Sequence, residues 1–171
     1  LLEGKGAKTV LVVTKGFEDQ LRIGYQNRPD IFSRKITLPI QLYEKVIGVD
    51  ERILSDGKII TELDNFKLKI ELLECLKNGI TSCAILLMHG YKYINHEKKI
   101  SKLAQSLGFD QVSASHEISP QIRFVERGDT TVLDAYLTPI LKIYIEQLVQ
   151  NLSGNVGHNL TFLQSNGGWI S

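Results

Sequence analysis

The stretch that decides the fold of this chain is Glu126-Arg-Gly-Asp-Thr-Thr-Val-Leu-Asp-Ala-Tyr-Leu-Thr-Pro-Ile-Leu-Lys-Ile-Tyr-Ile-Glu-Gln-Leu-Val-Gln150. Asp129 can cap a helix that begins with the two threonines after it. Polar side chains then recur every fourth residue, which places them on one narrow stripe. A surface helix needs an apolar face of only about 100°, and nearly every other position here is apolar. The pattern therefore predicts a helix that the rest of the fold encloses.

The polar stripe of this helix has a simple interpretation. Its members are Asp134, Thr138, Lys142, Glu146 and Gln150. A solvent-facing seam on a core helix explains them better than a ladder of catalytic groups does. Pro139 lies inside the same helix, where it lacks an N–H group, removes one backbone hydrogen bond and is expected to bend the axis.

Short apolar segments alternate with helical patterns along much of the chain. Residues 8–14, 81–88, 111–115 and 160–164 are typical of buried strands. Residues 17–25 have helical spacing. Residues 43–50 and 58–62 flank the turn signal Ser55-Asp56-Gly57, which predicts a β-hairpin or a loose meander. Strands that alternate with helices predict right-handed crossovers and mainly parallel pairing, hence the α/β class with a mixed, mainly parallel sheet.

Two helices are predicted between these strands. The first follows a cap at Asp64, runs to residue 77 and carries four apolar side chains on one face: Phe66, Ile70, Leu73 and Leu76. The second follows a cap at Asn95, ends at Gly108 and turns four side chains inward: Ile100, Leu103, Ala104 and Leu107.

Composition excludes several classes of function. A net charge of +1 without a basic cluster argues against a nucleic-acid or membrane-surface role. No apolar run reaches the length of about 20 residues that spans a bilayer. The only cysteines are Cys75 and Cys83, for which a cytosolic pair of reduced thiols is the simplest account, and Cys83 in a buried strand is expected to be inert.

Residue spacing predicts neither a metal site nor a phosphate loop. The histidines at 89, 96, 116 and 158 fall on different predicted elements, and no two of them share a helix at the i, i+4 spacing of metal ligands. Neither Gly-x-x-x-x-Gly-Lys-Ser/Thr nor Gly-x-Gly-x-x-Gly occurs. The chain begins without an initiator methionine and ends just after a predicted strand and turn, so we expect a piece of a longer protein.

Several collinear blocks carry a family resemblance. They are Leu1-Leu-Glu-Gly-Lys-Gly-Ala-Lys-Thr-Val-Leu-Val-Val-Thr-Lys-Gly-Phe-Glu-Asp19 with its continuation to Phe32, and then residues 43–53, 124–139 and 164–168. Together they resemble the hydantoinase/oxoprolinase A-type family and are closer to its 5-oxoprolinases than to hydantoinases generally. Residues 1–120 resemble the N-terminal region of that family, and residues 121–171 resemble the start of its main domain.

The resemblance implies an actin/hexokinase-like (ribonuclease H-like) nucleotide-binding fold. It also implies the ATP-driven opening of a cyclic amide with Mg²⁺, here of 5-oxo-L-proline to L-glutamate in glutathione metabolism, in the cytoplasm. Phosphorylating the amide oxygen supplies a leaving group before water attacks. The implied partners are the rest of the same enzyme or a B-type subunit, and a homodimer is a further arrangement to consider.

The resemblance also indicates what these 171 residues lack. The family's Asp-x-Gly-Gly-Thr phosphate loop is expected upstream of Leu1, and its second glycine-rich phosphate segment downstream of Ser171. We therefore expect the chain alone to bind neither ATP nor a metal well and to show no turnover. The alternatives are an ATP-dependent hydantoinase, an acetone-carboxylase-like subunit, or a non-catalytic remnant of a split gene.

Matched polar positions supply the candidate site residues, although no catalytic residue can be assigned. The candidates for shaping the substrate side are Lys15, Asp19, Gln26 and Arg28. The candidates for a cleft edge are Gln164, Ser165, Asn166, Gly167 and Gly168. For each position, an ordinary loop or turn contact remains the competing explanation.

Overall fold

A four-stranded parallel sheet is the centre of the computed structural model, which describes residues 5–25, 32, 38, 40–151, 162–163 and 169–170. The chain forms two compact units, Leu1–Pro139 and Ile140–Ser171. The sheet belongs to the first unit and has the order β2-β1-β5-β6. Its strands are β1 (Thr9–Thr14), β2 (Lys45–Val49), β5 (Ser82–Leu86) and β6 (Gln111–Ala114). The α/β class and three of the predicted strands are thereby confirmed.

The central strands are buried because both of their faces are covered. Every residue of β1 and β5 is buried, as expected for strands rich in β-branched and small apolar side chains inside a parallel sheet. In β1, Val10 and Val12 face one layer of helices while Leu11 and Val13 face the other. The period of two along a strand thus divides the core into two clusters.

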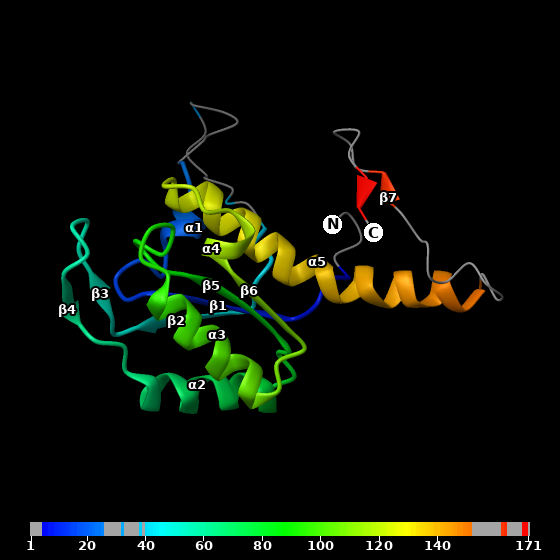
Figure 1. The fold of residues 1–171 in the computed structure, drawn as a ribbon, viewed down its shortest axis with the longest axis horizontal. Helices are drawn as coiled ribbons and strands as arrows, with labels where there is room; N and C mark the ends of the chain where they lie inside the picture. The colour runs from blue at the N-terminus through cyan, green and yellow to red at the C-terminus, as the bar shows by residue number, and fades with distance from the viewer. Residues whose placement is uncertain are drawn as a thin grey trace. The chain divides into compact units, whose positions relative to one another are not determined.

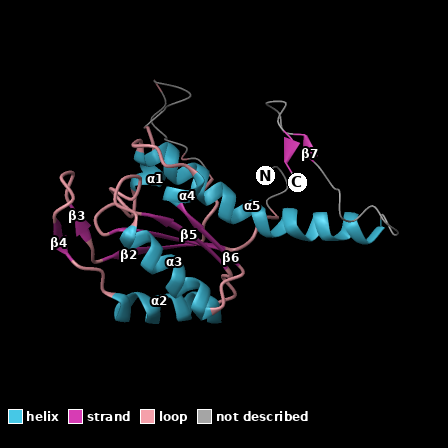
Figure 2. Cartoon of the chain, viewed as in Figure 1, coloured by secondary structure: helices cyan, strands magenta, loops and turns pink. Residues whose placement is uncertain are grey.

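Helices lie on both faces of the sheet, as Figure 1 and Figure 2 show. One face packs against α2 (Asn65–Lys77) and α3 (Asn95–Leu107), and the other against α1 (Gln20–Ile23) and the first half of α5 (Phe124–Asn151). The chain moves outward from β1 to β2, crosses back to β5 and continues to β6. Right-handed crossovers in these two directions place their helices on opposite faces. The carboxyl ends of β1 and β5 therefore flank the point where the winding changes direction, which is where ligands bind in open α/β sheets.

The predicted cap of α2 is confirmed, whereas of its predicted face only Leu76 packs against the core and Phe66, Ile70 and Leu73 are exposed. The Asp64 carboxylate accepts hydrogen bonds from the N–H groups of Phe66 and Lys67 at 3.0 and 3.2 Å. The side chains buried against the sheet are Leu68, Leu72 and Cys75. Phe66 and Ile70 are exposed by 76% and 54%. Two apolar stripes run along this helix, and the helical period alone does not show which of them meets the sheet.

Helix α3 has the predicted inward face. Ile100 and Ala104 are fully buried, and the half-buried Leu103 and Leu107 pack against the same cluster. Gly108 ends the helix in the left-handed region with φ of 95°, which favours glycine. Asn95 is the first helical residue rather than the cap, a position that Ile94 occupies.

The predicted hairpin exists with a different first strand. β3 (Arg52–Ile53) pairs antiparallel with β4 (Ile59–Thr61) around the 55–57 turn. Residues 45–49 instead form the edge strand β2, which pairs in parallel with β1. The predicted turn is confirmed, but the β-rich segment before it contains two strands, β2 and β3, with Asp50 and Glu51 between them.

Helix α5 begins at Phe124, five residues before the predicted cap at Asp129, and continues through Pro139. Since proline has no N–H group, the carbonyl of Ala135 loses its helical partner. The Ser82 hydroxyl of β5 donates to that carbonyl, and the Ala7 N–H donates to the Tyr136 carbonyl at 3.0 Å. The proline therefore frees the Ala135 carbonyl to tie the helix to the sheet, and the Tyr136 carbonyl ties it to the segment before β1.

The two halves of α5 differ in burial. Up to Tyr136 the helix contributes to the core, and Asp134 on the predicted polar stripe is half-buried and accepts a hydrogen bond from Ser113 Oγ at 2.6 Å. Beyond Pro139, Leu141, Ile143 and Tyr144 are each more than half exposed. The prediction that the fold encloses the whole helix is therefore wrong for residues 140–150, and the stripe is not simply a solvent-facing seam.

Two further short elements complete the description. α4 (Ser115–Ile118) follows β6 directly and was not predicted. In the second unit, β7 (Phe162–Leu163) pairs antiparallel with β8 (Trp169–Ile170), so the parallel pairing expected for residues 160–164 is wrong. In the part of the chain that the structure describes, no helix is both long enough and apolar enough to cross a membrane.

Substitutions on the two stripes of α2 test which one belongs to the core. Leu72→Ala removes a fully buried side chain and is expected to lower the free energy of unfolding by about 2–5 kcal/mol. Ile70→Ala, two residues away and half exposed, is expected to change it by less than about 0.5 kcal/mol. Urea unfolding measures both, and equal losses would show that the buried face has been assigned wrongly.

Candidate functional site

Six buried polar residues gather at the carboxyl edge of the parallel sheet. They come from the ends of β1 and β6, from the segment after β2, and from the first turns of α3 and α5. Each is at most 5% exposed: Thr14, Glu51, His96, Glu97, Ser115 and Arg127. Burying so many polar groups is costly unless each finds partners, so their hydrogen bonds define the geometry of this edge.

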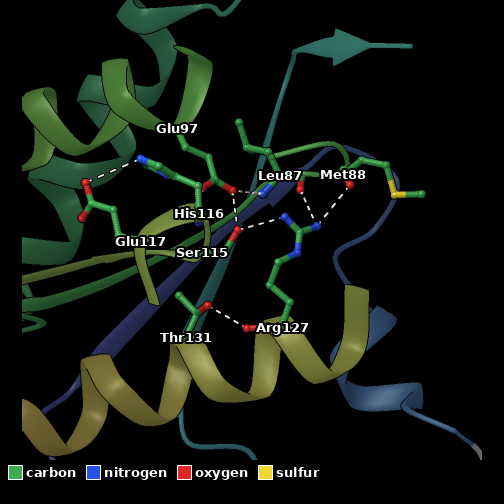
Figure 3. Close-up of polar contacts among 8 residues, drawn as sticks. All are labelled: Leu87, Met88, Glu97, Ser115, His116, Glu117, Arg127 and Thr131. Atoms are coloured by element: carbon green, nitrogen blue, oxygen red, sulfur yellow. Dashed lines mark hydrogen bonds and ion pairs between the residues drawn. The ribbon is translucent and has the colours of Figure 1, made fainter. Parts of the chain in front are cut away.

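Glu97 organises one half of this edge (Figure 3). Its Oε1 accepts hydrogen bonds from the Leu87 N–H at 2.9 Å and from the Ser115 hydroxyl at 2.6 Å. Its Oε2 accepts from the His116 N–H at 2.9 Å and lies 2.7 Å from His116 Nδ1. A carboxylate has about four acceptor positions, so the Glu97 side chain is saturated by the protein itself. A Cβ atom at position 90 would lie 2.1 Å from Oε1, so any residue other than glycine there would displace the Glu97 carboxylate from these partners.

Arg127 completes this network from α5. Its Nη1 donates to Ser115 Oγ at 3.0 Å, and its Nη2 donates to the carbonyls of Leu87 and Met88 at 2.9 and 3.1 Å. Burial lowers the pKa of Arg127, and the Glu97 charge opposes that shift. Because the Ser115 hydroxyl donates to Glu97 and accepts from Arg127, it connects the two opposite charges without direct contact between them.

A second set of contacts lies on the other side of the same strand end. Thr14 Oγ1 accepts a hydrogen bond from the Met88 N–H at 3.0 Å and donates to Glu51. The other oxygen of Glu51 lies 2.8 Å from His96 Nδ1. Two neighbours in α3 therefore point to opposite sides, His96 toward Glu51 and Glu97 toward Ser115. The backbone of residues 87–88 is therefore held from two sides, by Glu97 at the Leu87 N–H and by Thr14 at the Met88 N–H.

Charged and exposed residues lie at the same edge, at the ends of β1 and β2. Lys15 Nζ lies 2.6 Å from one oxygen of Asp50, and Lys67 Nζ lies 3.4 Å from the other. The hydrogen bond from Lys15 holds the pKa of Asp50 below its ordinary value and raises that of Lys15. Lys15 is 59% exposed, so a ligand can reach its ammonium group.

The other sequence candidates are placed less favourably or not at all. Asp19 is exposed just before α1 and makes no capping hydrogen bond with its side chain. The remaining candidates lie outside the residues that the structure describes: Gln26, Arg28, Gln164, Ser165, Asn166, Gly167 and Gly168. Their suggested roles stay predictions.

Sequence reasoning missed the buried network, although two signals pointed to it. Glu97 shares a helical face with Ile100 and Ala104, which marks a carboxylate directed into the core. Arg127 is likewise aligned with the buried Thr131 and Ala135, at spacings of four and eight residues. Because the cap is predicted at Asp129, Arg127 falls before the predicted helix, whereas in the structure it lies in the first turn of α5 and points into the core.

The edge has limited capacity to hold phosphate or a metal by itself. The N–H groups of Lys15, Gly16, Leu87 and Met88 all donate to protein acceptors. Among the described residues, no three His, Cys, Asp or Glu side chains are placed to hold a metal ion. The carboxylates of Glu51 and Glu97 are already occupied by hydrogen bonds. The described residues therefore form a rigid polar scaffold with a charged rim, and we derive no metal-dependent step from them.

Comparison with known families gives two matches. The pattern of the hydantoinase/oxoprolinase N-terminal region matches residues 1–108, and that of the hydantoinase/oxoprolinase region matches residues 127–171. The chain is 40% identical to 5-oxoprolinase 1 of Arabidopsis thaliana and 37% identical to a 5-oxoprolinase of Dictyostelium discoideum, over 98% of its length in both cases. It spans only 15% of the length of each of these relatives.

Two solved structures share the fold. The ATP-dependent caprolactamase from Pseudomonas jessenii matches 98% of the chain with a TM-score of 0.83 and 27% identity. A nucleotide-free acetone carboxylase matches 99% of it with a TM-score of 0.80 and 21% identity, which shows the fold alone. The chain corresponds to about a quarter of each of these proteins, 25% and 26% respectively. These matches support an α/β nucleotide-binding fold.

Removal of the buried guanidinium tests whether the network stabilises the fold. Arg127→Met removes the positive charge nearest to the buried Glu97 network and the donors to the Leu87 and Met88 carbonyls, and is expected to lower the free energy of unfolding by about 3–5 kcal/mol. Arg123→Met removes an exposed guanidinium that pairs with Glu126 in the same region, and is expected to change the free energy of unfolding by less than about 1 kcal/mol. Guanidinium chloride unfolding measures the difference. Similar small losses in both variants would contradict a stabilising role for Arg127.

Proposed function

The chain belongs to the hydantoinase/oxoprolinase family, and on that premise we propose that it is part of an ATP-dependent enzyme that opens 5-oxo-L-proline to L-glutamate. The observation that carries the proposal is its similarity, over nearly its whole length, to 5-oxoprolinases. The named caprolactamase is also an ATP-dependent enzyme, which supports a cyclic amide as the substrate class. We further propose that the N-terminal region of the family ends near residue 120 and that its main domain begins at residue 121.

The chemistry explains why ATP is needed. An amide carbonyl is a poor electrophile, so transfer of the γ-phosphoryl group to its oxygen makes the carbon open to attack by water. In balance, two water molecules are consumed, the ring C–N bond breaks, the nitrogen leaves as the amino group of glutamate, and ADP and phosphate are released. Mg²⁺ would neutralise the transferring phosphate. We assign no ligand for it to the described residues.

The proposed contribution of this chain is to form one wall of the site. The buried network holds the carboxyl ends of β1, β5 and β6, and Lys15 extends from that edge toward solvent. An ammonium group there would attract the carboxylate of 5-oxoproline or a phosphate of ATP. Asp19, and the sequence candidates outside the described residues, remain candidates for the same wall. The phosphate-binding segments would come from the rest of the enzyme.

The assembly and location follow from the same proposal. The chain would act within a larger polypeptide or together with a B-type subunit, and a homodimer is compatible with either arrangement. We place the enzyme in the cytoplasm, in glutathione metabolism. A second candidate is an amide-opening enzyme with another ring, favoured by the likeness to the caprolactamase at 27% identity.

An assay on the complete gene product that contains these 171 residues tests the proposal. With ATP and Mg²⁺ present, we expect release of glutamate and ADP from 5-oxo-L-proline, at a kcat/KM at least about tenfold above that for hydantoin or caprolactam, which corresponds to about 1.4 kcal/mol of discrimination. The 171-residue chain alone, assayed in parallel, is expected to release no glutamate. Preference for hydantoin or caprolactam would overturn the substrate assignment, and turnover by the chain alone would overturn its role as one wall of a larger site.

A further inference from the structure

A basic pocket of about 480 Å³ lies where the β3–β4 hairpin meets the N-terminal half of α3. Ile53 and Ile59 of the hairpin form one wall. The opposite wall is formed by the segment that leads into α3 and by the exposed face of that helix. Four lysines line the pocket: Lys92, Lys98, Lys99 and Lys102. Its lining shares His96 with the polar edge but contains none of Glu97, Ser115 and Arg127, and the function proposed above gives the cavity no role.

The three helical lysines occupy one face of α3 by spacing. Lys98, Lys99 and Lys102 follow the i, i+1, i+4 pattern, opposite the buried side chains of Ile100 and Ala104. Lys99 lies 3.7 Å from Glu62, whereas Lys98 and Lys102 form no ion pair within the described part of the chain. Like charges at i, i+4 destabilise a helix. A solvated basic face would explain the lysines alone, so only a further group in the pocket can indicate a ligand.

The additional group in the pocket is a buried histidine. His96 is 1% exposed, lines the pocket and is fixed through Nδ1 to Glu51 at 2.8 Å. Its Nε2 is buried and has no hydrogen-bond partner, and the nearest acid is Glu62 at 3.6 Å, whose own side chain is 69% exposed. A buried ring nitrogen without a partner is rare in native structures, which indicates an acceptor or donor that binds there.

The pocket also lies at the N-terminus of α3, a position that favours binding of an anion. Residues 94–96, at the N-terminus of α3, also line it. The first N–H groups of a helix have no partner within the helix, and the helix dipole favours negative charge at this end. Lysines, a histidine nitrogen and a helix N-terminus thus converge on one cavity, and the carboxylates of Glu51 and Glu62 lie beside the histidine.

We propose that this pocket binds a phosphate-bearing small molecule. A phosphate group carries a charge of about −1.5 to −2 and three strong acceptor oxygens, which suits several ammonium donors better than a single carboxylate does. Binding would relieve the repulsion between Lys98 and Lys102 and give His96 Nε2 a partner.

Titration of the full chain with pyrophosphate at constant ionic strength tests the proposal. We expect saturable binding by calorimetry, together with a change in the ¹⁵N signal of His96 Nε2. The double variant Lys98→Gln/Lys102→Gln is expected to bind at least about tenfold more weakly, because it removes two ammonium donors that can make charge-assisted hydrogen bonds to the anion. The matched control Lys69→Gln/Lys77→Gln removes two exposed lysines of α2 and is expected to bind as the parent does.

Comparison of ADP with pyrophosphate distinguishes a nucleotide ligand from a phosphate ester without a base. If ADP binds more tightly than pyrophosphate, and the pocket variant weakens both, the ligand is a nucleotide; the reverse order indicates a phosphate ester without a base. Absence of saturable binding, or equal weakening in the two double variants, would overturn the proposal. Since the readout is binding to this chain, a negative result leaves the reaction proposed above untouched, and a failed 5-oxoproline assay leaves the pocket untouched.

Discussion

The buried guanidinium of Arg127 is the constraint on which the carboxyl edge of the sheet depends. A charge with no solvent exposure is stable only where hydrogen bonds and an opposite charge compensate for lost hydration. Here the carbonyls of residues 87–88, Ser115 and, through Ser115, Glu97 provide that compensation. The ends of β5 and β6, the start of α3 and the start of α5 must therefore keep one relative arrangement, since displacement of any of them would leave a buried charge uncompensated.

This constraint connects the two parts of the family pattern. Glu97 lies in the matched N-terminal region and Arg127 is the first residue of the second match. Further along α5, Pro139 frees the Ala135 carbonyl, which the Ser82 hydroxyl of β5 satisfies. The first half of α5 is thus fixed to the sheet at two points, while the exposed apolar side chains beyond Pro139 belong to the second unit. The scaffold is rigid at the edge where the reactive groups of a larger enzyme are proposed to meet.

Local rules predicted the elements more successfully than the contacts between them. β-Branched runs identified the buried strands, and the Asp64 cap and Gly108 bounded their helices because these signals depend on neighbouring residues. The buried face of α2 could not be chosen, since its two apolar stripes have the same period. Such rules could not predict the hydrogen bonds among Glu97, Ser115 and Arg127, because these residues come from distant segments of the chain. The position of Glu97 on the apolar face of α3 did indicate a buried carboxylate. Among the predicted site residues, Lys15 was suggested by resemblance and not by spacing, and its role stays a prediction.

Amide hydrogen exchange at Leu87 and Met88 tests the central claim most directly. Both N–H groups lie beyond the last residue of β5 and donate only to side chains, to Glu97 and Thr14. If the buried network holds this edge, both amides exchange only through global unfolding, with protection equal to that of the central residues of β1. Exchange at the rate of an open loop, while β1 remains protected, would show that the network does not hold the edge.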